Sequence, residues 1–160
     1  MIADAVSFRS VRQDDKELLL QWRNEPTTWR CCIQCRPVTA QEHENWFEGI
    51  WTRDDVKLFI LLYNGTPVGQ IRYDLQKLES KVSLTVSPNY RGKGVGVEGL
   101  LRTSAEMFKV TAITQVVALV RNDNISSLRC FEKVGFLKSG KQMIQGHNYE
   151  KLILSRMLSA

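Results

Sequence analysis

Hydrophobic and polar residues follow two spacings along this chain, one typical of strands and one typical of helices. Alternating or short apolar runs predict strands at residues 6–11, 57–63, 67–75, 82–86, 115–121, 136–140 and 147–157. Apolar residues at helical spacing predict helices that begin near residues 14 and 39 and helices that cover residues 97–108 and 124–134. The segment 28–37 is predicted to be a loop. The chain is therefore predicted to interleave strands with helices.

Local signals indicate where several of these elements begin and end. Asn64-Gly65 between two strand patterns predicts a tight hairpin turn. Thr39 followed by Glu42 predicts a capping box at the start of the second helix. The first helix is predicted to stop before Pro26, because the residue before a proline is pushed out of the helical region.

One stretch, residues 82–108, carries the clearest chemical signal. It begins as an alternating strand, breaks at Ser87-Pro88, passes through Arg91-Gly92-Lys93-Gly94-Val95-Gly96 and continues with helical spacing. Glycines lack the Cβ atoms that would keep a ligand away from the backbone, so successive N–H groups at a helix N-terminus can converge on an anion. The helix dipole favours the same charge. We therefore predict a pyrophosphate site at this loop.

Two common nucleotide motifs fit the loop poorly. A Walker loop needs a Lys followed by Ser or Thr after its last glycine, whereas Lys93 lies among the glycines with no hydroxyl after it. A dinucleotide fingerprint can be written through Gly94, Gly96 and Gly99, but such a fold places it near its first strand, with an acidic residue after the next one. The dinucleotide interpretation is the weaker alternative.

The motif Arg91-x-x-Gly94-x-Gly96, between a strand and a helix, resembles the coenzyme-A loop of the GNAT superfamily of acyl-CoA-dependent N-acetyltransferases. A second block, Asn124-x-x-Ser127-x-x-x-Phe131-x-x-x-Gly135-Phe136, resembles the other half of that cofactor site. The resemblance covers nearly the whole chain. It implies a single α/β (α+β) domain over residues 1–160, with a mixed, mostly antiparallel sheet of about seven strands. The sheet is expected to splay in the middle and to be flanked by about four helices.

The resemblance also implies how acetyl-CoA binds as a co-substrate. Pantetheine is expected to lie between the strand that ends at Val86 and the strand that starts near Val116, with a backbone N–H near Val86 polarising the thioester carbonyl. The residues expected to bind acetyl-CoA are Thr85, Val86, Arg91, Gly92, Lys93, Gly94, Val95, Gly96, Asn124, Ser127, Phe131 and Lys133.

The route of the protons is the point at which the chain departs from the family pattern. The family usually has a tyrosine, which protonates the departing thiolate, where this chain has Phe131. Phenylalanine has no proton to give, so either Tyr149 or Tyr90 replaces it or the thiolate leaves unassisted. A sugar amine of low pKa needs only a weak base, for which His43 and Ser83 are the candidates, ahead of Asp74. The expected catalytic residues are His43, Ser83 and Tyr149.

Three further segments indicate the acceptor. Residues 20–26, 41–47 and 69–74 resemble the branch that acetylates amino sugars on nucleotide carriers in bacterial pathways to pseudaminic acid and related surface glycans. The expected acceptor is a UDP-linked 4-amino-4,6-dideoxy sugar, bound by Arg23, Asn24, Trp29, Arg30, Trp46, Arg72 and Asp74. Relatives that acetylate protein N-termini share these segments more loosely, so a protein α-amine is the enzymatic alternative. A non-catalytic CoA-binding module, suggested by Phe131, is the third hypothesis.

Composition narrows the function classes further. The chain has 160 residues, 43% of them apolar, and a net charge of +5. No apolar run approaches the roughly 20 residues that span a bilayer, and the start of the chain lacks a signal-peptide pattern, so we expect a cytoplasmic protein without membrane contact.

The four cysteines are then expected to be reduced, and the run Cys31-Cys32-x-x-Cys35 lacks a convincing fourth zinc ligand, so no metal is expected. No nucleic acid is expected as a partner either, because an arginine run and an aromatic RNA motif are both missing. The sequence leaves open whether the chain forms a homodimer.

Overall fold

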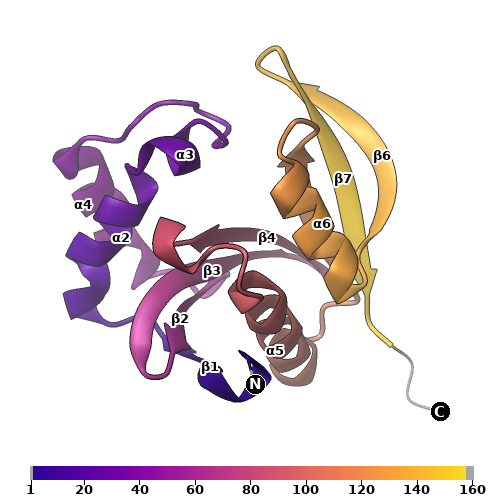
Figure 1. The fold of residues 1–160 in the computed structure, drawn as a ribbon, viewed down its shortest axis with the longest axis horizontal. Helices are drawn as coiled ribbons and strands as arrows, with labels where there is room; N and C mark the ends of the chain where they lie inside the picture. The colour runs from indigo at the N-terminus through magenta and orange to yellow at the C-terminus, as the bar shows by residue number, and fades with distance from the viewer. Residues whose placement is uncertain (1, 158–160) are drawn as a thin grey trace.

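A single mixed sheet organises the computed structural model, which describes residues 2–157. Its strands lie in the order β1-β2-β3-β4-β5-β7-β6, and only the contact between β4 and β5 is parallel (Figure 1). The strands are β1 (Val6–Ser10), β2 (Val56–Tyr63), β3 (Thr66–Gln76), β4 (Glu79–Val86), β5 (Gln115–Arg121), β6 (Leu137–Ile144) and β7 (His147–Ser155). The predicted mixed, mostly antiparallel sheet of seven strands is confirmed.

The described residues form four longer helices, which match the four that were predicted. They are α2 (Lys16–Arg23), α4 (Ala40–Ile50), α5 (Val95–Val110) and α6 (Ile125–Val134). Two single-turn helices, α1 (Ile2–Ala5) and α3 (Pro26–Trp29), and two 3-10 turns, η1 (Gln13–Asp15) and η2 (Pro88–Tyr90), complete the list. The prediction of a loop from residue 28 onward missed the end of α3. Pro26 occupies the first turn of α3, and the Glu25 side chain caps it by accepting a hydrogen bond from the Thr28 N–H.

The local signals mark the element ends as predicted. Asn64 and Gly65 both have positive φ, 48° and 83°, as a two-residue hairpin turn between β2 and β3 requires. The Thr39 side chain and the Glu42 side chain cap α4 reciprocally. In each case the residues that define the turn or cap are neighbours in sequence.

The helices cover the two faces of the sheet with separate apolar clusters. On one face, α5 contributes Leu100 and Met107 to a large core that includes Ile71 and Tyr73 of β3. On the other face, α2 and α4 pack against alternate residues of β2. The members of this second cluster are Leu19, Trp22, Phe47, Ile50, Leu58 and Ile60.

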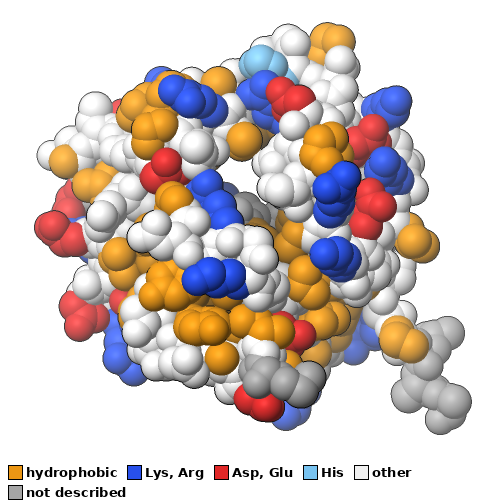
Figure 2. Space-filling view, in the orientation of Figure 1, with side chains coloured by type: hydrophobic (Ala, Val, Ile, Leu, Met, Phe, Trp, Pro, Cys, Tyr) orange, Lys and Arg blue, Asp and Glu red, His pale blue; other side chains and the backbone are white. Residues whose placement is uncertain are grey.

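The sheet opens in its middle, as the family resemblance implied. β4 and β5 pair only at their first residues, Glu79–Lys81 with Gln115–Val117. Beyond these residues β4 pairs with β3 alone and β5 pairs with β7 alone. The surface is hollowed between the part that carries α2, α3 and α4 and the part formed by α6, β6 and β7 (Figure 2). We refer to the opening between the later parts of β4 and β5 as the split.

Candidate functional site

The glycine loop lies directly before α5 and adopts a conformation suited to an anion. Gly92 and Gly94 have φ of 74° and 84°, in the left-handed region that glycine adopts without strain. Gly94 precedes the first residue of α5, and no side chain caps the helix start. A Cβ atom at Gly92 would meet nothing within 4 Å, so the loop backbone is open to a ligand. Free N–H groups and the positive end of a 16-residue helix fit a pyrophosphate.

Gly96 also has a packing role, and its predicted contact with acetyl-CoA stays a prediction. It lies inside α5, and a Cβ atom there would be 3.0 Å from the Cys130 Sγ atom and 3.2 Å from a Leu84 methyl group. Its missing side chain lets α5 approach β4 and α6. Val95 is also buried, so only its backbone is available to acetyl-CoA.

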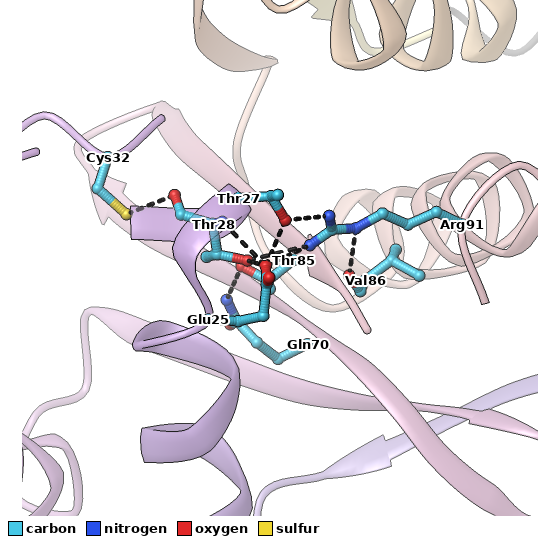
Figure 3. A network of polar contacts seen from close by, with 8 residues as sticks. All are labelled: Glu25, Thr27, Thr28, Cys32, Gln70, Thr85, Val86 and Arg91. Atoms are coloured by element: carbon cyan, nitrogen blue, oxygen red, sulfur yellow. Dashed lines mark hydrogen bonds and ion pairs between the residues drawn. The ribbon is translucent and has the colours of Figure 1, made fainter. Parts of the chain in front are cut away.

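The Arg91 side chain forms its hydrogen bonds to other residues of the protein. Its Nε atom donates to the Val86 carbonyl oxygen at 2.8 Å, and its two terminal nitrogens donate to side chains on the first turn of α3 (Figure 3). These acceptors are Glu25, Thr27 and Thr28. The expectation that Arg91 binds acetyl-CoA is therefore corrected for its side chain, whose hydrogen bonds are made within the protein. Lys93 stays exposed, with its ammonium 5.5 Å from the centroid of the Tyr90 ring.

At the end of β4 one backbone donor is directed into the split. The Ser87 N–H donates to the Val68 carbonyl oxygen on the β3 side at 2.8 Å. Successive backbone groups of a strand alternate between its two edges, so the Val86 N–H points to the opposite edge. This is the position in which the family resemblance places an oxyanion donor. Thr85, the residue before it, accepts a hydrogen bond from the Gln70 amide at 3.2 Å.

The second family block is built largely from structural contacts. The Asn124 side chain caps α6 by accepting from the Ser127 N–H at 3.3 Å. Phe131 is 3% exposed and meets Phe136 edge-on, with ring centroids 5.0 Å apart. The ring therefore packs in the core, and its place beside the thioester sulfur stays a prediction. Lys133, in the last turn of α6, is exposed and free to face a phosphate.

His43 lies in the contact between α4 and α2. Its imidazole is 5% exposed, and its Nε2 atom has no hydrogen-bond partner among the described residues. Burial lowers the pKa of the imidazole, which is therefore neutral at pH 7. Stacking near Trp46 and Phe47 explains this placement. The expectation that His43 heads an open cleft as a general base is corrected, because the ring is enclosed by aromatic side chains.

Tyr149 occupies the β5 side of the split. It is paired with Arg121 in the register of β7 and β5, so the two side chains share a face of the sheet. The ring is 2% exposed, and its hydroxyl makes no hydrogen bond with residues 2–157. Burial raises the pKa of this hydroxyl, and this effect is larger than the lowering of the pKa by the nearby Arg121 guanidinium. Tyr149 is therefore a protonated donor with no acceptor among residues 2–157.

Several predicted acceptor residues meet on the face of β3 and β4 opposite α5. The register pairs Arg72 with Ser83, so both project to this face. The Arg72 guanidinium donates to Asp74 at 3.0 Å and lies 5.9 Å from the centroid of a Trp46 ring. The structure thus brings together the predicted residues Trp46, Arg72, Asp74 and Ser83.

The remaining predicted acceptor residues lie at the end of α2 and in α3 or directly after it. Asn24 is not free to bind a substrate, because its amide both donates to and accepts from the Val38 backbone at 2.8 Å. Arg23 donates to the Arg36 carbonyl oxygen at 3.0 Å. The Arg30 guanidinium carbon lies 5.6 Å from the centroid of the Trp29 ring. Arg30 is exposed, and Trp29 is half-buried. The prediction for Asn24 is corrected, because its amide fixes the loop backbone instead.

Four residues that contribute to this region were missed from the sequence. Glu25, Thr27 and Thr28 receive the hydrogen bonds of Arg91, and Arg121 donates to the Arg30 carbonyl oxygen at 2.7 Å. Arg121 is a charged residue at the end of an otherwise apolar strand, which is the one signal that pointed to it. No pattern in the sequence connected it with α3.

Comparison with known proteins agrees with this site. Residues 6–137 match the model of the acetyltransferase (GNAT) domain. The chain therefore belongs to the GNAT acetyltransferase family and is an acetyl-CoA-dependent acyltransferase. This confirms the predicted family, enzyme class and co-substrate, whereas the nucleotide-sugar acceptor stays a prediction.

Two curated relatives and two solved structures show the extent of the similarity. The chain is 24% identical over 154 residues to "Aminoglycoside N(6')-acetyltransferase type 1" of Klebsiella pneumoniae, covering 86% of this chain and 76% of the relative. It is 30% identical over 130 residues to the uncharacterized N-acetyltransferase YfmK of Bacillus subtilis, covering 81% and 83%. The fold matches AAC(6')-Ib in complex with ribostamycin and coenzyme A with a TM-score of 0.82 at 19% identity, covering 96% and 94% of the two chains. It also matches spermidine N-acetyltransferase from Vibrio cholerae in complex with CoA and spermine with a TM-score of 0.85 at 13% identity, covering 95% and 96%.

The described part of the chain contains neither a metal-binding cluster nor a membrane-spanning helix. Among residues 2–157, no group of three or more His, Cys, Asp and Glu side chains is arranged to hold a metal ion. In the same range no helix has both the length and the apolar composition needed to cross a membrane.

Proposed function

We propose that the chain transfers an acetyl group from acetyl-CoA to the amine of an anionic amino sugar, of the UDP-linked 4-amino-4,6-dideoxy type. The observation that carries this proposal is the charge around the acceptor residues. Within residues 2–157, neither Arg23 nor Arg30 forms an ion pair, whereas three carboxylates beside the predicted acceptor residues are each paired with an arginine. Asp74 pairs with Arg72, Glu25 with Arg91, and Glu42 with Arg36.

This charge pattern favours an acceptor that carries phosphate. Aminoglycosides and spermine are polycations, and a site for them needs carboxylates that are free to pair with ammonium groups. Here the unpaired groups include the guanidiniums of Arg23 and Arg30, and a guanidinium binds phosphate oxygens with two parallel hydrogen bonds. Lys and Arg side chains lie on both sides of the hollow (Figure 2). Trp29 and Trp46 add flat apolar surfaces suited to a base or a sugar ring.

The catalytic roles follow from the side chains and backbone groups at the split. The Val86 N–H is directed to polarise the thioester carbonyl while the acceptor nitrogen forms its bond to the acyl carbon. The carbon–sulfur bond then breaks, and the Tyr149 hydroxyl gives its proton to the departing sulfur. The amine proton leaves through water beside Ser83, which shares a face with Arg72. We assign no step to His43, because its imidazole packs against Trp46 and Phe47 of α4.

The acceptor class is tested by thiol release from acetyl-CoA with four amines. These are a UDP-linked 4-amino-4,6-dideoxyhexose, kanamycin, spermidine and a peptide with a free α-amine. We expect kcat/KM for the UDP-linked amine to exceed that for spermidine by about 100-fold, a difference of about 2.7 kcal/mol in transition-state stabilisation. Preference for spermidine, kanamycin or the peptide would contradict the anionic acceptor. Binding of acetyl-CoA without turnover of any amine would favour the non-catalytic module.

A further inference from the structure

Residues 25–36, which we call the strap, form a loosely packed segment on the acceptor side. It comprises α3 and the turns that follow it. None of its twelve residues is buried, and Ile33 is 43% exposed. Apolar packing therefore contributes little to its position. Its place in the molecule depends on hydrogen bonds.

One arginine from the β4 side of the split binds the first turn of the strap. Arg91, which follows η2, donates to the Thr27 and Thr28 hydroxyls at 2.5 and 3.1 Å and approaches the Glu25 carboxylate at 3.4 Å (Figure 3). Its Nε atom is bound at the same time to the Val86 carbonyl oxygen. Arg91 thus connects the strap directly to the residue that presents the oxyanion donor.

A second arginine, from the β5 side, binds the middle of the strap. Arg121 is the last residue of β5, and its Nη1 atom donates to the Arg30 carbonyl oxygen at 2.7 Å. The same guanidinium is held by Asp123 through two hydrogen bonds of 3.1 and 2.9 Å, which fix its orientation. The Cys35 Sγ atom lies 4.0 Å from Nη1. The strap therefore crosses the split and is tied to both of its sides.

We infer that Arg91 and Arg121 are positioning residues that hold the strap across the split and thereby place Trp29 and Arg30 for the acceptor. The strap is also fixed near its ends, by Arg23 at the Arg36 carbonyl oxygen and by Asn24 at Val38. Between these ends, Arg91 and Arg121 form the hydrogen bonds that connect the strap to the two sides of the split. The anchoring stands on geometry alone, and only its catalytic consequence rests on the proposed function.

The reactivity of Cys32, a thiol inside the strap, reports the position of the strap in the absence of an acceptor substrate. The Cys32 side chain is half-buried and lies 3.5 Å from the Thr28 carbonyl oxygen, whereas Cys31 beside it is exposed. Alkylation by iodoacetamide, followed by peptide mass spectrometry, gives the ratio of the Cys32 rate to the Cys31 rate in one molecule. Release of the strap exposes Cys32 and raises this ratio, while the Cys31 rate serves as an internal reference.

The test compares Arg91→Ala and Arg121→Ala with Arg53→Ala. Arg53 forms a similar two-bond pair with Asp55 outside the strap, so its loss controls for removal of a surface arginine. We expect the Cys32 to Cys31 ratio to rise about tenfold in each strap variant and to stay within twofold in Arg53→Ala. A ratio within twofold of the wild type in Arg91→Ala and Arg121→Ala, with thermal midpoints retained, would overturn the anchoring. The Arg121→Lys variant cannot keep both the Asp123 pair and the Arg30 contact, so it is expected to raise the ratio as well.

Steady-state kinetics distinguish a positioning role of Arg121 from a merely structural one. With the UDP-linked 4-amino-4,6-dideoxyhexose as the acceptor probe, Arg121→Ala should raise the acceptor KM about tenfold. The dissociation constant of acetyl-CoA should stay within threefold, since Arg121 does not contact the glycine loop. A fall in kcat with an unchanged acceptor KM would contradict a positioning role. Failure of this probe as a substrate would instead count against the proposed acceptor, and the thiol ratio would still test the anchoring.

Discussion

Arg91 and Val86 form one unit at the end of β4. The Arg91 Nε atom donates to the Val86 carbonyl oxygen at 2.8 Å, while the Val86 N–H stays directed into the split. Both backbone groups of Val86 lie on the edge that β5 leaves open. Arg91 satisfies the acceptor of that pair, and in the proposed mechanism the donor binds the thioester carbonyl. One guanidinium is therefore bound both to the end of β4 and to the first turn of the strap.

The glycine loop gives the first prediction. Gly94→Ala should weaken acetyl-CoA binding at least tenfold, because a side chain at φ 84° costs roughly 1–2 kcal/mol and displaces the backbone donors. Gly65→Ala is the matched control, since Gly65 has φ 83° in a hairpin turn away from the loop. Isothermal titration of both variants checks the prediction. Equal acetyl-CoA affinity in Gly94→Ala and the wild type would mean that the loop only starts the helix.

Tyr149→Phe separates catalysis from stability. The substitution keeps the buried ring and removes a hydroxyl that has no hydrogen-bond partner in the described part of the chain, so the free energy of unfolding should not fall. Positioned proton transfer typically contributes 10²- to 10⁴-fold, and we expect a loss of about 10²- to 10³-fold in single-turnover acetyl transfer. Tyr90→Phe is the control and should change the rate less than threefold. An unchanged rate in Tyr149→Phe would show that the thiolate leaves unassisted.

Phe131→Tyr should not improve the enzyme. Relatives are expected to carry a donating tyrosine at this position, but here the ring is 3% exposed and packs edge-on against Phe136. A hydroxyl added to this core costs about 1–3 kcal/mol unless it finds a partner. We expect a gain in single-turnover rate below tenfold and a lower midpoint in urea. A gain of 10²-fold or more would place the wild-type ring at the sulfur and make thiolate departure the slow step.

His43 should affect stability in acid and leave the chemical step unchanged. Burial lowers its pKa in the folded protein, so below the unfolded value of about 6.5 the unfolded chain binds more protons. Stability should therefore fall as pH drops from 7.5 to 5.5. His43→Leu should reduce this pH dependence, measured by urea unfolding at both pH values, and should keep kcat within threefold. A large loss of kcat with full stability would restore His43 as the general base.

Signals between residues that are close in sequence predicted most of the fold. The Asn64-Gly65 turn and the Thr39–Glu42 box each involve a few neighbouring residues, and both form as expected. The glycine loop was predicted for a similar reason, since its chemistry lies in one short stretch of backbone. The predicted strand at 115–121 has the same bounds in the structure, because a continuous apolar run marks a strand buried on both faces.

Contacts between distant residues account for what the sequence did not reveal. Arg91 and Thr27 are 64 residues apart, and Arg121 and Arg30 are 91 apart. Neither pair leaves a periodic or local signal. The same applies to His43, whose helical face was predicted correctly but whose burial depends on α2. Asn24 was assigned to the acceptor by resemblance, and its amide is bound to the Val38 backbone instead.

A competition experiment tests the central claim most directly. Equal concentrations of a UDP-linked 4-amino-4,6-dideoxyhexose and spermidine are mixed with limiting acetyl-CoA, and the two acetylated products are counted by mass spectrometry. The product ratio equals the ratio of the two kcat/KM values, and therefore reports discrimination between an anionic and a polycationic acceptor. The unpaired Arg23 and Arg30 lead us to expect about 100-fold more acetylated sugar nucleotide than acetylated spermidine. An excess of acetylated spermidine would contradict the account.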